Sequence, residues 1–145
     1  MKCILLAAVL ALGLSAPVHA QEALPYSEGA VVEVTAVDIM DGEFDNYLEY
    51  LQSKYKPIME AQKKAGIILD YGVYQNQVGS DEDADLYLVV FYPNMAMLDG
   101  LRQKVDPIAT QVGGQSVKQS NAAFAARGKM RNIMGTELLR ELKLK

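Results

Sequence analysis

The octapeptides LQSKYKPI, residues 51–58, and LRQKVDPI, residues 101–108, share leucine, lysine, proline and isoleucine at the same four positions. Both belong to segments whose apolar residues recur every three or four positions, the spacing of an amphipathic helix. A proline inside a helix removes a hydrogen bond and crowds the preceding turn, at a cost of about 3 kcal/mol. The shared octapeptide therefore predicts two related helices. The first either kinks at Pro57 or ends near Tyr55 and restarts with Pro57 in its first turn, and Gly66 ends it.

Strand patterns flank both helices. The segment AVVEVTAVDIM, residues 30–40, is rich in β-branched residues. Its side chains alternate between two faces, with Val32, Val34 and Ala36 on one and Glu33, Thr35 and Val37 on the other. The segments IILDYGVYQNQV, residues 67–78, and DLYLVVFY, residues 85–92, predict the second and third strands. Because the third strand is apolar on both sides, we expect it in the centre of the sheet.

The last third of the chain admits more than one interpretation. Residues 120–135 are rich in alanine and predict a further helix, while residues 136–145 fit either a continuation of that helix or a strand. We favour the strand, because Gly135 interrupts the helical pattern and two strand–helix units need a fourth strand. Asp41 and Asn94 are expected to cap the two earlier helices.

The order strand–helix–strand occurs twice and predicts an α+β fold, the ferredoxin-like βαββαβ sandwich with an antiparallel sheet and two helices on one face. The repeated octapeptide then marks equivalent points of a duplicated unit, although four shared positions also arise by chance. One chain has no second layer of helices to cover the other face of an apolar sheet. We therefore expect a homodimer in which two sheets pack face to face.

The first twenty residues have the pattern of a signal peptide. Lys2 precedes the apolar run ILLAAVLALGL, which is shorter than the ~20 residues of a membrane span, and the small residues of SAPVHA follow. We expect cleavage after Ala20 and an exported, periplasmic protein that is not attached to the membrane, with a retained anchor as the alternative. Residues 21–30 are expected to form a tether and residues 31–145 one domain, since about 125 residues is an ordinary domain size.

Cleavage would restrict the available chemistry, because the single cysteine, Cys3, and the single histidine, His19, both precede Ala20. Without them the chain has no disulfide, no cysteine nucleophile, no Ser-His-Asp triad, no Cys/His zinc site and no haem held by histidine or cysteine. Removal of Lys2 leaves 13 basic against 18 acidic residues, a formal charge of −5. We expect no metal or other cofactor and no nucleic acid, which requires a basic surface.

The order of elements, the segment YKPIMEAQKKAG at residues 55–66 and the closing RNIMGTELLRELKLK at residues 131–145 resemble the dimeric α/β-barrel superfamily of small ferredoxin-like proteins. The resemblance covers roughly Val31 to Lys145. Relatives in this superfamily include antibiotic-biosynthesis monooxygenases, chlorite-dismutase-like haem proteins and muconolactone isomerases. The resemblance implies a pocket between sheet and helices or inside the barrel, but no single chemistry. The proximal histidine of the haem branch has no counterpart after Ala20.

The candidate site residues are polar side chains on strands that we expect to face the barrel interior. They are Glu33, Thr35, Asp70, Tyr74, Tyr87 and Arg140. Arg140 is expected to neutralise Glu33 or Asp70, whereas a buried carboxylate without a partner would have a raised pKa and could act as a general base. The alternative is that these groups form a hydrogen-bonded dimer interface.

Two further clusters have simpler interpretations. Tyr47, Tyr50 and Tyr55 fit packing positions on the first helix, and the run Arg127, Lys129, Arg131 fits a solvated face or intersubunit ion pairs, with an anion site as the alternative. The acidic segment GSDEDAD, residues 79–85, fits a solvated turn, since a calcium loop needs a central glycine and a glutamate at its twelfth position.

Two functions remain open. The first is a non-catalytic exported homodimer that binds a small apolar or phenolic molecule or a protein partner. The second is a cofactor-independent enzyme, monooxygenase- or isomerase-like, that uses a buried carboxylate and tyrosines. The lack of imidazole favours the first, because histidine is the usual acid–base catalyst. An open cavity with an unpaired carboxylate would favour the second, and carboxylates paired to Arg140 would favour a plain interface.

Overall fold

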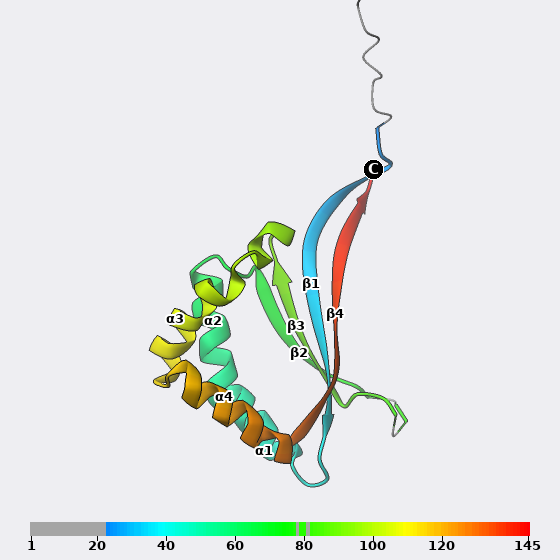
Figure 1. Ribbon diagram of the computed structural model, residues 1–145. Helices are drawn as coiled ribbons and strands as arrows, with labels where there is room; N and C mark the ends of the chain where they lie inside the picture. Colours follow the sequence, from blue (N-terminus) through cyan, green and yellow to red (C-terminus); the bar gives the residue numbers. More distant parts are fainter. Residues whose placement is uncertain (1–22, 78, 81) are drawn as a thin grey trace, which may run out of the picture.

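The computed structural model describes residues 23–77, 79–80 and 82–145. Its elements, in chain order, are β1 (Tyr26–Ile39), α1 (Phe44–Tyr50), the π-helical turn η1 (Leu51–Tyr55), α2 (Lys56–Lys64), β2 (Asp70–Gln75), β3 (Leu86–Tyr92), the 3-10 turn η2 (Met95–Leu98), α3 (Leu101–Gly113), α4 (Val117–Ala126), the 3-10 turn η3 (Arg127–Lys129) and β4 (Arg131–Leu144). The strands form one antiparallel sheet in the order β2-β3-β1-β4, and the helices lie on one face of it (Figure 1). This arrangement confirms the predicted ferredoxin-like α+β fold.

The strand register assigns each side chain to a face of the sheet. Glu33 lies opposite Val90 on β3 and Leu138 on β4. Directly paired residues share a face, and successive residues alternate between faces. The odd-numbered residues of β1 from 31 to 39 and the even-numbered residues of β3 therefore point toward the helices, on what we call the helix face. Their sequence neighbours point to the opposite side, which we call the open face.

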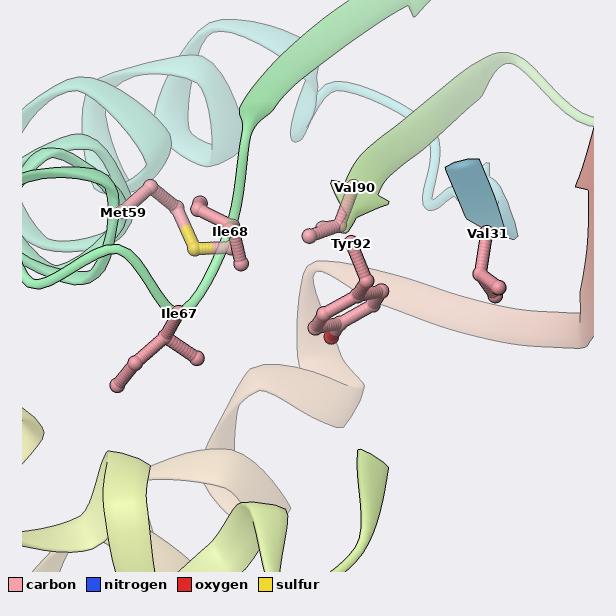
Figure 2. Close-up of a cluster of buried hydrophobic side chains, with 6 residues drawn as sticks. All are labelled: Val31, Met59, Ile67, Ile68, Val90 and Tyr92. Atoms are coloured by element: carbon pink, nitrogen blue, oxygen red, sulfur yellow. The ribbon is translucent and has the colours of Figure 1, made fainter. Parts of the chain in front are cut away.

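The helix face carries two separate core clusters. The first consists of Val31, Met59, Ile67, Ile68, Val90 and Tyr92 (Figure 2), and the second of Val37, Tyr47, Leu51 and Leu86. On β1 the first cluster includes Val31 and the second Val37, so Glu33 and Thr35 lie between them. The core is interrupted in the middle of β1.

The two related octapeptides lie on helices, as predicted, but their prolines have different surroundings. The helical conformation runs from α1 through the π-helical turn η1 into α2, with Tyr55 and Lys56 both right-handed helical, so the helix does not end and restart there; Pro57 falls in the first turn of α2, directly after the π-helical irregularity. Pro107 lies inside the thirteen-residue helix α3. Gly66 follows α2 with φ 72°, a left-handed conformation that favours glycine and ends the helix as expected.

Several predicted boundaries need correction. Strand β1 begins at Tyr26 and pairs with the end of β4, so residues 26–30 belong to the sheet rather than to a tether. No side chain caps α1, so the predicted cap at Asp41 is wrong. The Asn94 side chain does act as a cap, because it accepts a hydrogen bond from the Met97 N–H at the start of η2. The predicted signal peptide, residues 1–20, lies outside the described residues.

The C-terminal strand is confirmed, but it is longer than predicted. Helix α4 ends at Ala126 and β4 already begins at Arg131. Gly135 lies within this strand, next to a register shift at which Ala36 pairs with Gly135 and Val37 with Ile133. An extra residue in one strand of a pair is a β-bulge, where glycine is common. The glycine therefore marks a bulge and not the start of the strand.

Within the described part of the chain, no helix is both long enough and apolar enough to cross a bilayer.

Candidate functional site

A cavity of about 460 Å³ occupies the interruption between the two core clusters. Its floor is the helix face of β1 and β3, and α2 and α3 form its walls. Met59, Leu88, Val90 and Val105 contribute apolar surface, and Glu33 lies among them. An apolar cavity with a few polar groups is the usual form of a small-molecule site.

Glu33 is the carboxylate that the floor of this cavity presents. Its strand neighbours on the helix face are Val90 and Leu138, which cannot pair with a charge. Among the described residues, the structure gives the Glu33 carboxylate neither a hydrogen bond nor an ion pair. Burial raises the pKa of Glu33 above its ordinary value. A ligand with a hydrogen-bond donor would find an acceptor there.

The arginine that lines the cavity already has a partner. Arg102 and Asp106 both line the cavity from α3, and the Arg102 Nε lies 3.1 Å from the Asp106 carboxylate oxygen. This pair is one helical turn apart on the same helix, at the i, i+4 spacing of neighbouring surface residues. The guanidinium therefore neutralises Asp106 and not Glu33.

Two tyrosines line the same cavity. Tyr55 comes from the π-helical turn, and its hydroxyl is buried and has no hydrogen-bond partner in the described structure. Burial raises the pKa of Tyr55, and burial together with the Glu33 charge raises the pKa of Tyr92 to about 12. The Glu33 charge also contributes to the raised pKa of Tyr55. Both phenols are neutral at physiological pH, so the hydroxyl group of each can donate a hydrogen bond to a ligand oxygen.

The remaining polar groups of the site are partly satisfied. The Thr35 hydroxyl lies 3.1 Å from the hydroxyl of Thr136 on β4. The Gln62 side chain, 6% exposed, donates from Nε2 to the Met59 sulfur at 3.6 Å. In residues 23–77, 79–80 and 82–145, no group of three or more His, Cys, Asp or Glu side chains is placed to hold a metal ion.

The structure separates the six residues that the sequence singles out. Glu33 and Thr35 share the cavity, but on the helix face and not inside a barrel of two sheets. Tyr74 and Tyr87 are a cross-strand pair on the open face. Asp70 lies at the start of β2, where Lys63 binds its carboxylate at 2.8 Å and lowers its pKa.

The expected role of Arg140 is wrong. Its guanidinium lies 2.6 Å from the carboxylate of Glu28, the residue of β1 that lies three positions before Val31. Arg140 itself pairs with Val31, two residues away from Glu33 along β1. Neither Glu33 nor Asp70 has Arg140 as its partner, and Glu33 has none among the described residues.

Sequence reasoning misses three residues of the site. Tyr55 from η1 fits a packing position, and neither Gln62 on α2 nor Tyr92 at the end of β3 stands out from the apolar pattern around it. The alternation of β1 carried a signal, because Glu33 shares its side with Val37, which is fully buried under the helices. A polar residue in phase with a core residue points into the sandwich and not toward a partner subunit.

Two arginines near the end of α4 have aromatic partners instead of solvent. The Arg131 side chain is 6% exposed and lies 4.6 Å from the centroid of the Phe124 ring, and Arg127 lies 4.4 Å from that of Tyr50. Arg131 also hydrogen-bonds to the hydroxyl of Tyr47. The prediction of a solvated basic face is therefore wrong for Arg131. Its cation–π contact with Phe124 ties the start of β4 to α4, and the contact of Arg127 with Tyr50 ties η3 to α1.

No family model and no curated protein matches this sequence. Solved structures do match. HapK from Hahella chejuensis has 8% sequence identity and a TM-score of 0.50, over 77% of this chain and 91% of that chain. A nipsnap family protein with unknown function from Agrobacterium tumefaciens has 12% identity and a TM-score of 0.49, over 81% and 90%. A dimeric protein of unknown function and ferredoxin-like fold from Bacteroides fragilis has 15% identity and a TM-score of 0.45, over 78% and 95%.

At such low identities the likeness to HapK concerns the fold alone. The chain is an α+β protein with the ferredoxin-like fold, the fold of the dimeric α/β-barrel superfamily that its sequence resembles. Its candidate site is the largely apolar cavity between sheet and helices that contains Glu33, which has no partner among the described residues.

Proposed function

We propose that this protein is an exported homodimer that binds a small, mostly apolar molecule with a phenolic or similar hydroxyl group. One observation carries the proposal, namely that the half-buried Glu33 carboxylate has no partner among the described residues of a largely apolar cavity. A carboxylate removed from water normally pairs with a cation of the same protein, because an isolated charge is costly to desolvate. A ligand hydroxyl that donates to Glu33 would supply that missing partner, while its hydrocarbon part contacts Met59, Leu88 and Val90.

Homodimerisation is supported by the open face of the sheet. Its centre combines Val32, Val34, Val89 and Phe91 with Leu139, which is 49% exposed in the single chain. No element of the described chain covers this face, because all helices lie on the other side (Figure 1). A second copy would bury it symmetrically, and the cavity with Glu33 would remain separate within each subunit.

Export rests on the sequence of residues 1–20, with its basic start, short apolar run and small residues before Gln21. The measurement is the intact mass of the protein recovered from the periplasmic fraction of the organism that makes it. A mass equal to that of a chain starting at Gln21 supports the proposal. A mass equal to that of a chain that still starts at Met1 or Lys2 contradicts it.

Binding can be tested with phenol as the probe, titrated into the full chain by isothermal calorimetry. A hydrogen bond to a charged group contributes about 1.5–3 kcal/mol, so Glu33→Gln should weaken phenol binding at least about tenfold. The matched control is Glu82→Gln, which neutralises an exposed carboxylate in the loop between β2 and β3. Equal binding by Glu33→Gln and the unaltered protein, or no binding of phenol at all, contradicts the proposal.

The second candidate function is a cofactor-independent enzyme in which Glu33 removes a proton from a carbon next to a carbonyl. The unpaired carboxylate, its raised pKa and the two phenols that could hydrogen-bond a developing enolate favour it. Exchange of the α-protons of 2-tetralone for deuterium, followed by NMR, tests it. If the protein accelerates the exchange over the rate in buffer and Glu33→Gln abolishes this acceleration, catalysis is supported. If the exchange rate equals that in buffer, the enzyme function is refuted and only the binding function remains.

A further inference from the structure

A second cavity, of about 480 Å³, lies beside the first and has no role in the proposed function. It opens between the helical segment from α1 to the start of α2 and the edge strand β2. Leu48, Leu51, Tyr71 and Val73 give it an apolar lining. The Tyr55 side chain lines this cavity as well as the cavity that contains Glu33, and it packs against both core clusters.

We propose that Tyr55 is a movable partition between the two cavities, and that its displacement joins them into one channel for an elongated molecule. The head of that molecule donates a hydrogen bond to Glu33, and its unbranched hydrocarbon chain passes Tyr55 and ends beside Val73. This inference rests on the proposed function, because it places the head group in the cavity with Glu33. It adds the shape of the ligand and the residue that admits it.

Displacement of the Tyr55 side chain breaks packing contacts with both core clusters but no hydrogen bond of its hydroxyl group. Its hydroxyl is buried without a partner in the described structure, so no hydrogen bond of that group is lost when the side chain swings outward. Its ring contacts Tyr71 edge to face, with the centroids 6.0 Å apart. Tyr71 is held independently, because its hydroxyl donates to the Glu60 carboxylate at 2.7 Å. The partition can therefore move while the wall behind it stays in place.

The backbone at Tyr55 is also less constrained than that of a regular helix. Tyr55 is the last residue of the π-helical turn η1, a rare local geometry that often occurs at functional sites. Pro57 follows two residues later and has no N–H to bond with the preceding turn. The side chain that separates the cavities thus lies on the one part of the α1–α2 segment with irregular hydrogen bonding.

The lining of the second cavity selects a hydrocarbon chain. Its apolar lining consists of leucine and tyrosine side chains and of Val73, which is 40% exposed. The polar residues that border it, Glu49, Gln52 and Lys56, are exposed at the surface. A methylene chain needs no hydrogen-bond partners and gains free energy from leaving water. A second polar group would find no buried partner there.

The experiment uses a series of 4-alkylphenols, from phenol through 4-ethyl-, 4-butyl- and 4-hexylphenol to 4-octylphenol, titrated by calorimetry into the full-length protein. Burial of one methylene tightens binding about fourfold. We expect affinity to rise at this rate up to 4-octylphenol in the unaltered protein. Val73→Trp fills the second cavity, so the rise should stop at a shorter chain while phenol binds as before. Gln75→Trp is the control, because Gln75 lies two residues further on the same strand and lines neither cavity.

Each outcome separates the two proposals. If phenol binds through Glu33 but the rise with chain length is the same in Val73→Trp and Gln75→Trp, the channel is refuted and the proposed function stands. If phenol itself does not bind, the proposed function fails. Should Val73→Trp not fold, Leu48→Trp fills the same cavity from α1. Tyr55→Ala removes the partition and should raise the affinity for 4-octylphenol relative to that for phenol, and an unchanged ratio of the two affinities overturns the role of Tyr55.

Discussion

Glu33 makes the stability of this protein depend on pH in a direction opposite to that of an ion-paired carboxylate. An unfolded glutamate ionises near pH 4.3, and burial raises the pKa of Glu33 in the folded protein. Between these two values the folded chain holds a proton that the unfolded chain has released, so stability falls as pH rises through that interval. The charged Glu33 side chain lowers the stability of the folded protein. This cost is consistent with a role of the carboxylate in ligand binding rather than in folding.

The prediction is that Glu33→Gln removes this loss. The substitution should raise the melting temperature more at pH 7.5 than at pH 4. Circular dichroism melts of the variant and of the unaltered protein at both pH values measure this difference. The Glu82→Gln control, at an exposed carboxylate, should show no such change between the two. A difference that is the same at pH 4 and pH 7.5 contradicts the assignment of Glu33 to a desolvated position.

Tyr55 allows a second prediction at the scale of single residues. A buried hydroxyl without a partner costs about 1–3 kcal/mol, so Tyr55→Phe should leave the free energy of unfolding unchanged or raise it by about 1 kcal/mol. Tyr71→Phe is the comparison, because it removes the hydroxyl that donates to Glu60 and should lower stability slightly. Urea unfolding measures both. A clear loss of stability in Tyr55→Phe would mean that the hydroxyl has a partner.

Among the elements, α4 is the one that packs least. None of its side chains is fully buried, and its N-terminus is fixed by a capping box in which Ser116 and Gln119 bond each other's backbone N–H groups. At its other end Phe124 lies beneath the Arg127 and Arg131 guanidinium groups. The helix therefore depends on contacts at its two ends rather than on a buried stripe.

We predict that Ser116→Ala loosens α4 selectively. Loss of a serine cap costs about 1 kcal/mol, which corresponds to roughly fivefold faster amide exchange within the helix. Hydrogen exchange followed by mass spectrometry should detect this over Val117–Ala126 and not in β3. Lys118→Ala, at an exposed position without a capping bond, should leave exchange unchanged. Equal exchange in Ser116→Ala and the unaltered protein would show that the end contacts at Phe124 suffice.

For the whole molecule, the open face predicts the oligomeric state. An exposed apolar sheet face is a site of association, and the edge strand β4 contributes Leu139 to it. Light scattering after size exclusion should give twice the mass of one chain at micromolar concentration. Leu139→Asp, at a position already 49% exposed in the single chain, should give a folded monomer. Val112→Asp, on α3, is the control that stays dimeric. A monomeric unaltered protein would falsify the shared-sheet arrangement.

The sequence determined which segments are helices and strands wherever the apolar pattern was strong. The alternation around Glu33, the apolar third strand and the two related octapeptides all depend on local periodicity, which sequence order records directly. Boundaries at glycine were less secure, because Gly135 lies beside a bulge in β4 and Gly66 at a helix end. A glycine indicates that the backbone adopts an unusual conformation or a close approach at that position. Whether this is a bulge or a helix end depends on the neighbouring elements.

By itself, then, the sequence determined the ferredoxin-like order of elements, the apolar sheet and the presence of Glu33 on a strand. Only the tertiary structure decided that Glu33 faces α2 and α3, that Arg140 pairs with Glu28 and that Tyr55 lines two cavities. The physical reason is that periodicity fixes which side chains share a face, whereas the partner of a side chain depends on strand register and on helix placement. Both arise from contacts between residues far apart in the chain.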